Sequence, residues 1–313
     1  MANYVTTQDL LEDVLWRAFE NTDGSSQYKD AALRYLNRAY RSLWMGGSEF
    51  MPDQPTDWWW MKAQSSIIME AVYNTGTAVV TSDSTIVVLT DTPSISLQGR
   101  HIIFDGSDEL YLITEHAASD IGMVLDSVYI GDTDTVSFTA ILIDYDLPAD
   151  CLKIVDPMVT YRDGKGQIYG VGLAEMWEAY PPSNISLGTP KLYAPLSETR
   201  IRFSHYLDEL ARFDFTYLAA PDDLTDSSSS IPLLPLNYRH VLADMATFFV
   251  MTDKEEARAV GIGAQAKAGI KAMATENAMR WGGTGRPGQI DPRPTANRGW
   301  RRLMSGYRLW WGA

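Results

Sequence analysis

The chain reads TGTAVV at residues 75–80, STIVVLTD at 84–91, GRHIIFDG at 99–106, ELYLITEHA at 109–117, GMVLDSVYIG at 122–131 and TVSFTAILID at 135–144. These runs are rich in valine, isoleucine, threonine and tyrosine, which favour strands. Glycine, aspartate and serine separate them at close to the spacing of about 8 to 12 residues that is typical of a small antiparallel sandwich or barrel. We therefore expect a β module, inserted over residues 67–147.

The region before this module is predicted to be helical. Leu10, Leu11, Val14 and Leu15 recur at helical spacing, and Thr6 or Thr7 can cap the first turn. A polar, glycine-containing stretch, NTDGSS, then precedes a second amphipathic stripe that ends at the glycine pair 46–47. Residues 1–66 are therefore expected to form a helical hairpin that belongs to an α-helical core.

The region after the module returns gradually to helix. Residues 148–230 hold strand-like runs and polar loops that lead back to the core, and residues 231–281 are apolar and alanine-rich. The latter predict a long C-terminal helix, or two helices broken near Thr252. Residues 282–313 contain three prolines and several glycines, which excludes helix throughout and indicates an extended arm. The expected fold class is α+β.

Charge is distributed unevenly. The formal net charge is -14, yet from Arg280 onward seven arginines face Asp291 alone, which leaves about -20 on the rest of the chain. Nucleic-acid affinity comes largely from lysine and arginine side chains that replace condensed counterions. The acidic body is therefore not expected to bind DNA sequence-specifically.

No catalytic, metal-binding or cofactor-binding residue set is recognised. The glycine pattern GTGRPG at 283–288 follows a helix instead of a strand, the four histidines are scattered, and Cys151 lies at the start of an apolar strand. We expect a protein that is not an enzyme and has no cofactor. No apolar run approaches 18 residues and the first residues do not resemble a signal peptide, so we expect no membrane segment and no export.

Tryptophan is the unusual component of the composition, with ten residues. Trp58, Trp59 and Trp60 stand together, and tryptophan and arginine are the residues most enriched at interface hot spots. The three are a candidate subunit interface. The competing interpretation is that they fill the junction between the helical hairpin and the β module.

The order of these parts resembles a known family. Three stretches carry the resemblance: AALRYLNRAYRSLW at 31–44, YDLPADCLKI at 145–154 and IPLLPLNYRHVLADMATFFVMTDKEEARAV at 231–260. With the β insertion and the C-terminal arm, they resemble the head-to-tail adaptor, or connector, proteins of tailed double-stranded DNA bacteriophages. The insertion is longer than in the smallest such adaptors.

The resemblance implies a structural protein at the head-tail interface of the virion, assembled in the host cytoplasm. It implies a homo-oligomeric ring, generally a dodecamer in such adaptors, that contacts the portal protein and tail tube, nozzle or fibre proteins. The ring would surround part of the DNA channel, and DNA would pass through it non-specifically. In it the C-terminal arm would dock on the portal or a neighbouring copy through Arg298, Trp300, Arg301, Arg302, Tyr307, Arg308, Trp310 and Trp311. If the ring encloses DNA, the candidate channel-lining acids are Asp244, Asp253, Glu255, Glu256 and Glu276.

Two alternatives remain open on the sequence. One is a different tail ring component, such as a tail-tube, terminator or nozzle protein, which would bind tail proteins and not the portal. The other is an enzyme or a carbohydrate-binding module in which tryptophans stack on sugars. The β module holds few aromatic residues and no recognisable catalytic pair of carboxylates, which weighs against the second alternative.

Overall fold

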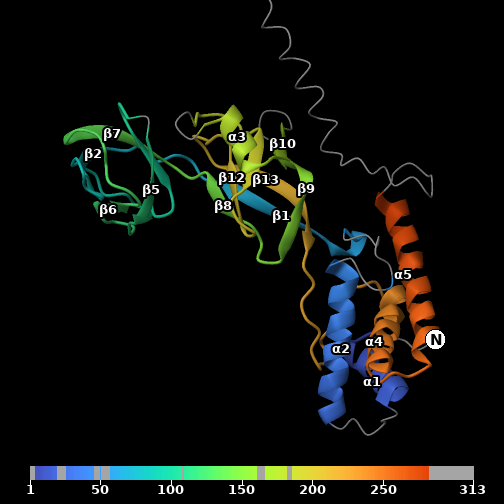
Figure 1. The fold of residues 1–313 in the computed structure, drawn as a ribbon. Helices are drawn as coiled ribbons and strands as arrows, with labels where there is room; N and C mark the ends of the chain where they lie inside the picture. Colours follow the sequence, from blue (N-terminus) through green and yellow to red (C-terminus); the bar gives the residue numbers. More distant parts are fainter. Residues whose placement is uncertain are drawn as a thin grey trace, which may run out of the picture. The chain divides into compact units, whose positions relative to one another are not determined.

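The structure of the chain is a computed structural model that describes residues 4–19, 26–45, 50, 57–107, 109–160, 166–181 and 185–281 (Figure 1). The chain is a mixed α and β protein and divides into two compact units. One unit combines Met1–Trp60 with Asp222–Ala313, and the other is Met61–Pro221. The helices of the first unit thus come from both ends of the chain, and the second unit is inserted between them.

The first unit is helical. Its elements are α1 (Thr7–Phe19), α2 (Ser26–Met45), α4 (Arg239–Asp253) and α5 (Ala259–Trp281), and α4 packs against each of the other three. Helix α4 is buried on nearly every side, including Leu242, Met245 and Phe249. A helix that is apolar all round belongs in the centre of a bundle, whereas α1 and α2 each have one apolar stripe facing it.

The start of α1 is fixed by a reciprocal cap. The Asp9 carboxylate accepts the backbone N–H groups of Val5 and Thr6, each at 2.8 Å, and the Asp9 N–H donates to the Thr6 hydroxyl at 3.3 Å. These backbone donors hold the pKa of Asp9 below its usual value. The cap therefore orients the helix so that Leu10, Leu11 and Val14 are buried.

Residues 231–281 do not form one long helix. Helix α4 ends at Asp253 and α5 begins at Ala259, after a turn in which Glu255 has a φ of 57°. The charged stretch DKEEAR (253–258) lies in this turn, where its side chains reach solvent instead of a core. The alternative of two helices broken near Thr252 is the one observed.

The inserted unit contains a closed six-stranded barrel in the order β2-β3-β6-β5-β4-β7, with every pair antiparallel. Alternate residues fill its interior, among them Val87, Phe104 and Phe138. The strands are β2 (Thr77–Val80), β3 (Ile86–Leu89), β4 (His101–Phe104), β5 (Leu110–Glu115), β6 (Gly122–Leu125) and β7 (Asp134–Ile141). Of the two architectures expected from the strand spacing, the structure has the barrel.

The same unit contains a seven-stranded sheet in the order β1-β13-β9-β10-β11-β12-β8. Only β10 and β11 pair in parallel, and the short helix α3 (Leu173–Ala179) packs against β11 through Met176. The strands are β1 (Lys62–Met69), β8 (Asp144–Asp146), β9 (Cys151–Thr160), β10 (Gly166–Gly170), β11 (Leu192–Pro195), β12 (Arg200–Phe203) and β13 (Ala211–Ala219).

The seven-stranded sheet includes strands from stretches that the sequence assigned to other domains. Strand β1 begins at Lys62, inside the stretch assigned to the helical hairpin, and pairs over its full length with β13. Strand β8 lies inside the stretch assigned to the β module, yet it pairs with β12 in the sheet. Both strands therefore belong to a second β structure that encloses the barrel sequence from either side.

Candidate docking surfaces

The three consecutive tryptophans pack within the helical unit. Trp58 is fully buried and its indole N–H donates to the Leu43 carbonyl at 2.9 Å. Trp60 is 8% exposed and stacks between Trp58 and Tyr40, with ring centroids 6.3 and 6.4 Å away. Trp58 and Trp60 are therefore interior residues of one protomer, and the expectation that they face another subunit is withdrawn.

Trp59 differs from its two neighbours because its side chain is only partly buried. Its backbone N–H donates to Asn277 at 2.8 Å, its ring meets Tyr238 edge-on at 6.2 Å, and the Arg280 guanidinium lies 5.0 Å from the ring. A partly exposed indole that is held by two ring contacts, next to an anchored backbone N–H, is pre-ordered for binding. Trp59 is thus the one member of this group that remains a candidate interface residue.

The five candidate channel acids do not form a single group. Asp244 is 7% exposed and is paired with Arg17 at 2.7 Å inside the bundle, so it is not retained as a channel residue. Burial raises the pKa of Asp244 despite this ion pair. Glu276 accepts the Tyr238 hydroxyl at 2.6 Å and pairs with Arg280. It lies about 25 Å along α5 from Ala259, the residue at which that helix begins.

Asp253, Glu255 and Glu256 lie together at the turn between α4 and α5. Asp253 accepts the Tyr35 hydroxyl at 2.7 Å, and Glu256 pairs with Arg258 at 2.8 Å. Glu255 is exposed, and the described part of the chain offers it no ion-pair or hydrogen-bond partner through its carboxylate. Lys254 and Arg258 share this turn, so its three acids and two bases leave a net charge of only -1.

A groove on α2 was not anticipated from the sequence. Its lining combines Arg34, Asn37, Arg38 and Arg41 with Asp223, around a volume of about 420 Å³. Arg41 pairs with Asp223 through its Nε and Nη2 atoms, and the Arg38 guanidinium lies 4.2 Å from the centre of the Phe249 ring. The arginines in AALRYLNRAYRSLW are spaced at i, i+4 and i+7, which places them on one helix face. This spacing is the sequence pattern from which the groove could have been predicted.

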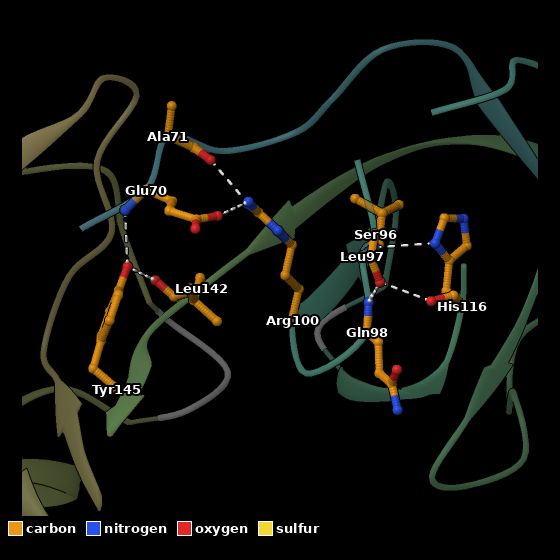
Figure 2. A network of polar contacts seen from close by, with 9 residues as sticks. All are labelled: Glu70, Ala71, Ser96, Leu97, Gln98, Arg100, His116, Leu142 and Tyr145. Atoms are coloured by element: carbon orange, nitrogen blue, oxygen red, sulfur yellow. Dashed lines mark hydrogen bonds and ion pairs between the residues drawn. The ribbon is translucent and has the colours of Figure 1, made fainter. Parts of the chain in front are cut away.

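Partly buried polar contacts attach the barrel to the sheet (Figure 2). Arg100, which precedes β4, donates to the Ala71 carbonyl at 2.9 Å and pairs with the Glu70 carboxylate. The Glu70 N–H donates to the Tyr145 hydroxyl at 3.0 Å, and that hydroxyl donates to the Leu142 carbonyl. The two segments in which the chain passes between the sheet and the barrel are thus hydrogen-bonded to each other.

A second contact set joins the same parts. The Arg202 guanidinium of β12 binds both oxygens of Asp144 at 2.6 and 2.7 Å, and its Nη2 lies 2.9 Å from Nε2 of His101 on β4. Burial, which outweighs the nearby Asp144 carboxylate, lowers the pKa of His101 to about 4. His101 is therefore neutral at pH 7, with Nε2 as the acceptor and Nδ1 carrying the proton.

The described residues contain no group of three or more histidine, cysteine, aspartate or glutamate side chains that could hold a metal ion. Burial raises the pKa of the Cys151 thiol to about 11, which disfavours the nucleophilic thiolate at neutral pH. Within the described chain, no helix is long and apolar enough to cross a membrane. The arm residues Arg298 to Trp311 named above lie outside the described residues.

The described chain thus combines a helical unit that exposes arginines on α2 with an inserted, acidic β unit. The family model described as SU10 adaptor protein matches residues 117–288, more than half of the chain. The protein belongs to the SU10 adaptor protein family, and it is therefore a structural adaptor of a bacteriophage virion that interacts with other virion proteins. No curated protein matches the chain.

Proposed function

We propose that this adaptor forms a ring that docks beneath the portal, joins the capsid to the tail and surrounds part of the DNA channel. The observation that carries the proposal is the separation of charge. The body carries about -20 before Arg280, and seven arginines with one aspartate follow. A conduit for DNA must not hold phosphate, and an acidic body meets that requirement while the arm retains the cations.

The ring contacts are assigned to the helical unit, in which the α1–α2 hairpin and the C-terminal helices would form the ring core. The outer face of α5 exposes several small or apolar side chains beside the exposed Lys267 and Lys271, and the small side chains permit close approach of a neighbouring copy. The small or apolar side chains include Val260, which is 79% exposed, Ala264, Ala268, Ala272 and Met279. Trp16 of α1, 65% exposed, offers a second apolar contact.

Three acids are assigned to the channel. Asp253, Glu255 and Glu256 share one turn, so that in a ring each copy would contribute a patch at the same height. Glu276 lies at the other end of α5 and is assigned to a second level. A reconstruction with the β unit around the channel and this turn outside would refute the assignment.

The arm is assigned to docking, on the portal or on a neighbouring copy. Its tryptophans would fill apolar pockets and its arginines would pair with acids, and each truncated anchor is expected to cost about 1 to 4 kcal/mol per subunit. Repetition around a ring multiplies such losses through avidity. Catalysis has no part in the proposal: no hydrolase activity on DNA, peptidoglycan or polysaccharide is expected.

The test combines the protein with its portal. Twelve copies of the 35.0 kDa chain would add about 420 kDa to the portal mass, measured by native mass spectrometry. Deletion from Pro292 onward should leave the circular dichroism spectrum of the folded chain intact and abolish stable attachment. Unchanged attachment of the truncated chain would exclude the docking role, and binding to tail proteins alone would favour the other tail ring components.

A further inference from the structure

The barrel exposes an apolar face on three neighbouring strands. Val79 of β2 is paired with Val88 of β3, and Ile86 of β3 is paired with Val124 of β6. Val79 and Val88 are each 40% exposed and Ile86 is 60% exposed. Cross-strand pairing places these four side chains next to one another on the outside of the barrel, and together they are named the β2-β3-β6 face.

The fold of the barrel does not require these four side chains to be apolar. The alternate residues of the same strands, including Ala78, Val87 and Met123, already fill the interior. The barrel is closed, so it offers no free strand edge for a partner strand to join. A partner must therefore bind this part of the barrel through side chains on its outer face.

The rim of the face is acidic. Exposed Asp83 lies in the turn between β2 and β3, Glu115 is the cross-strand partner of Val124, and Asp120 precedes β6. The Asp120 carboxylate accepts the N–H groups of Ile121 and Gly122, which holds its pKa below the usual value. These carboxylates favour a cationic partner.

No exposed cation offsets this rim. Arg100 is the only lysine or arginine between Lys62 and Lys153, it is 3% exposed, and it is occupied by Glu70 and Ala71. Nucleic acid is therefore repelled. A matching partner needs arginine or lysine side chains together with large apolar side chains.

The chain itself contains such a segment. Residues 286–313 hold six arginines against Asp291, together with Trp300, Trp310 and Trp311. The 32 residues that follow Trp281 could span roughly 100 Å if fully extended, enough for this segment to reach another copy. We propose that the β2-β3-β6 face binds residues 286–313 of a second copy of this chain.

This inference rests on the proposed function, because a ring brings many copies of the face and of the segment to high effective concentration. It names the surface that the arm would occupy when it docks on a neighbouring copy. Tryptophan side chains cover the valine and isoleucine side chains, and arginines reach Asp83, Glu115 and Asp120 at the rim. The arm would then link neighbouring subunits instead of contacting only the portal.

The test is a titration of a fluorescent peptide with the sequence of residues 286–313 against the full-length protein, without portal. The peptide is expected to bind. The double variant Ile86→Thr, Val88→Thr should raise the dissociation constant of the peptide by about tenfold or more. Threonine keeps the β-branched shape, so the strands are retained. Raising the salt from about 50 to 500 mM should also weaken binding, because the rim charges are screened.

The matched control is Ile68→Thr on β1. Ile68 is 60% exposed, as is Ile86, but it lies on the sheet and not on the barrel. This variant should bind the peptide within about twofold of the unchanged protein. A peptide in which Trp300, Trp310 and Trp311 are replaced by alanine should bind neither the unchanged protein nor the Ile68→Thr control.

Two outcomes would overturn the inference: absence of peptide binding to the unchanged protein, or equal loss in the barrel variant and the Ile68 control. Thermal melting of each variant separates loss of binding from loss of fold. The ring mass with portal is measured independently. A ring that attaches to the portal while the peptide fails to bind refutes only this inference, and a bound peptide without portal attachment refutes only the proposed function.

Discussion

At the residue scale, the charges that matter most to the fold are the buried ones. The Arg202 side chain is 14% exposed and that of Asp144 is 5% exposed, whereas the corresponding values for Arg212 and Asp214 are 68% and 36%. Both pairs have a shortest contact of 2.6 Å, so their distance does not distinguish them. Solvent screening distinguishes the two pairs. An exposed ion pair contributes little to stability, whereas a buried charge that has lost its partner costs several kcal/mol.

The first prediction concerns this buried pair. Asp144→Asn should lower the free energy of unfolding by about 3 kcal/mol or more, because Arg202 keeps its charge without a counterion. Asp214→Asn should change it by less than about 1 kcal/mol. Urea unfolding measures both. The double variant Asp144→Leu, Arg202→Met should be less destabilised than Asp144→Asn, and an equal or larger loss would contradict the role of the uncompensated charge.

The second prediction concerns pH. The folded-state pKa of His101 is about 4, below the value of 6.5 in an unfolded chain. Between these values the unfolded chain binds a proton that the folded chain does not, so His101 contributes its full stability above about pH 6.5 and loses it as the pH falls toward 4. The decrease is on the order of 2 to 3 kcal/mol. His101→Gln should show a flatter stability profile over this range, and parallel profiles would exclude the assignment.

At the element scale, α4 and α5 depend on glycine where their backbones approach. A Cβ on Gly269 would lie 2.5 Å from Val241 Cγ2 of α4, whereas a Cβ on Gly261 of the same helix would meet nothing within 4 Å. Both glycines have ordinary helical backbone geometry, so steric space alone separates them. Gly269 is therefore needed for helix packing and Gly261 is not.

The third prediction follows from this pair of glycines. Gly269→Ala should lower the free energy of unfolding by about 1 to 3 kcal/mol, because the two helices must separate. Gly261→Ala should leave it unchanged or raise it by up to about 1 kcal/mol, because alanine has the higher helix propensity. Thermal and urea unfolding of the two variants measure these changes in the free energy of unfolding. Equal effects would show that the α4–α5 contact tolerates the extra methyl group.

At the scale of the whole molecule, the two units have different chemistry. The helical unit is discontinuous in sequence and presents arginines on α2, whereas the barrel presents acids and no exposed cation among its described residues. The family match covers the end of the barrel sequence, most of the sheet, α4 and α5, but neither α1 nor α2. The matched part thus spans both units.

The fourth prediction tests the charge separation. The chain truncated from Pro292 should not retain duplex DNA at any salt concentration, because the remaining body is strongly acidic. The full-length chain should retain DNA weakly at about 50 mM salt and release it by about 200 mM, because only the arm carries excess cations. A filter-binding series at both concentrations measures this. Salt-resistant DNA binding by the truncated chain would contradict an acidic conduit.

The sequence by itself determined the elements with strong local periodicity: the stripes of α1 and α2, the apolar α4 and the six runs that became the barrel. It also determined the charge separation and the resemblance to phage adaptors, because these depend on composition and order alone. Only the tertiary structure decided that β1 pairs with β13, about 150 residues away, since nothing local in a strand specifies a distant partner. The same holds for Trp58, Trp60 and Asp244: their residue types favour interfaces and solvent, yet helices brought together from both ends of the chain enclose them.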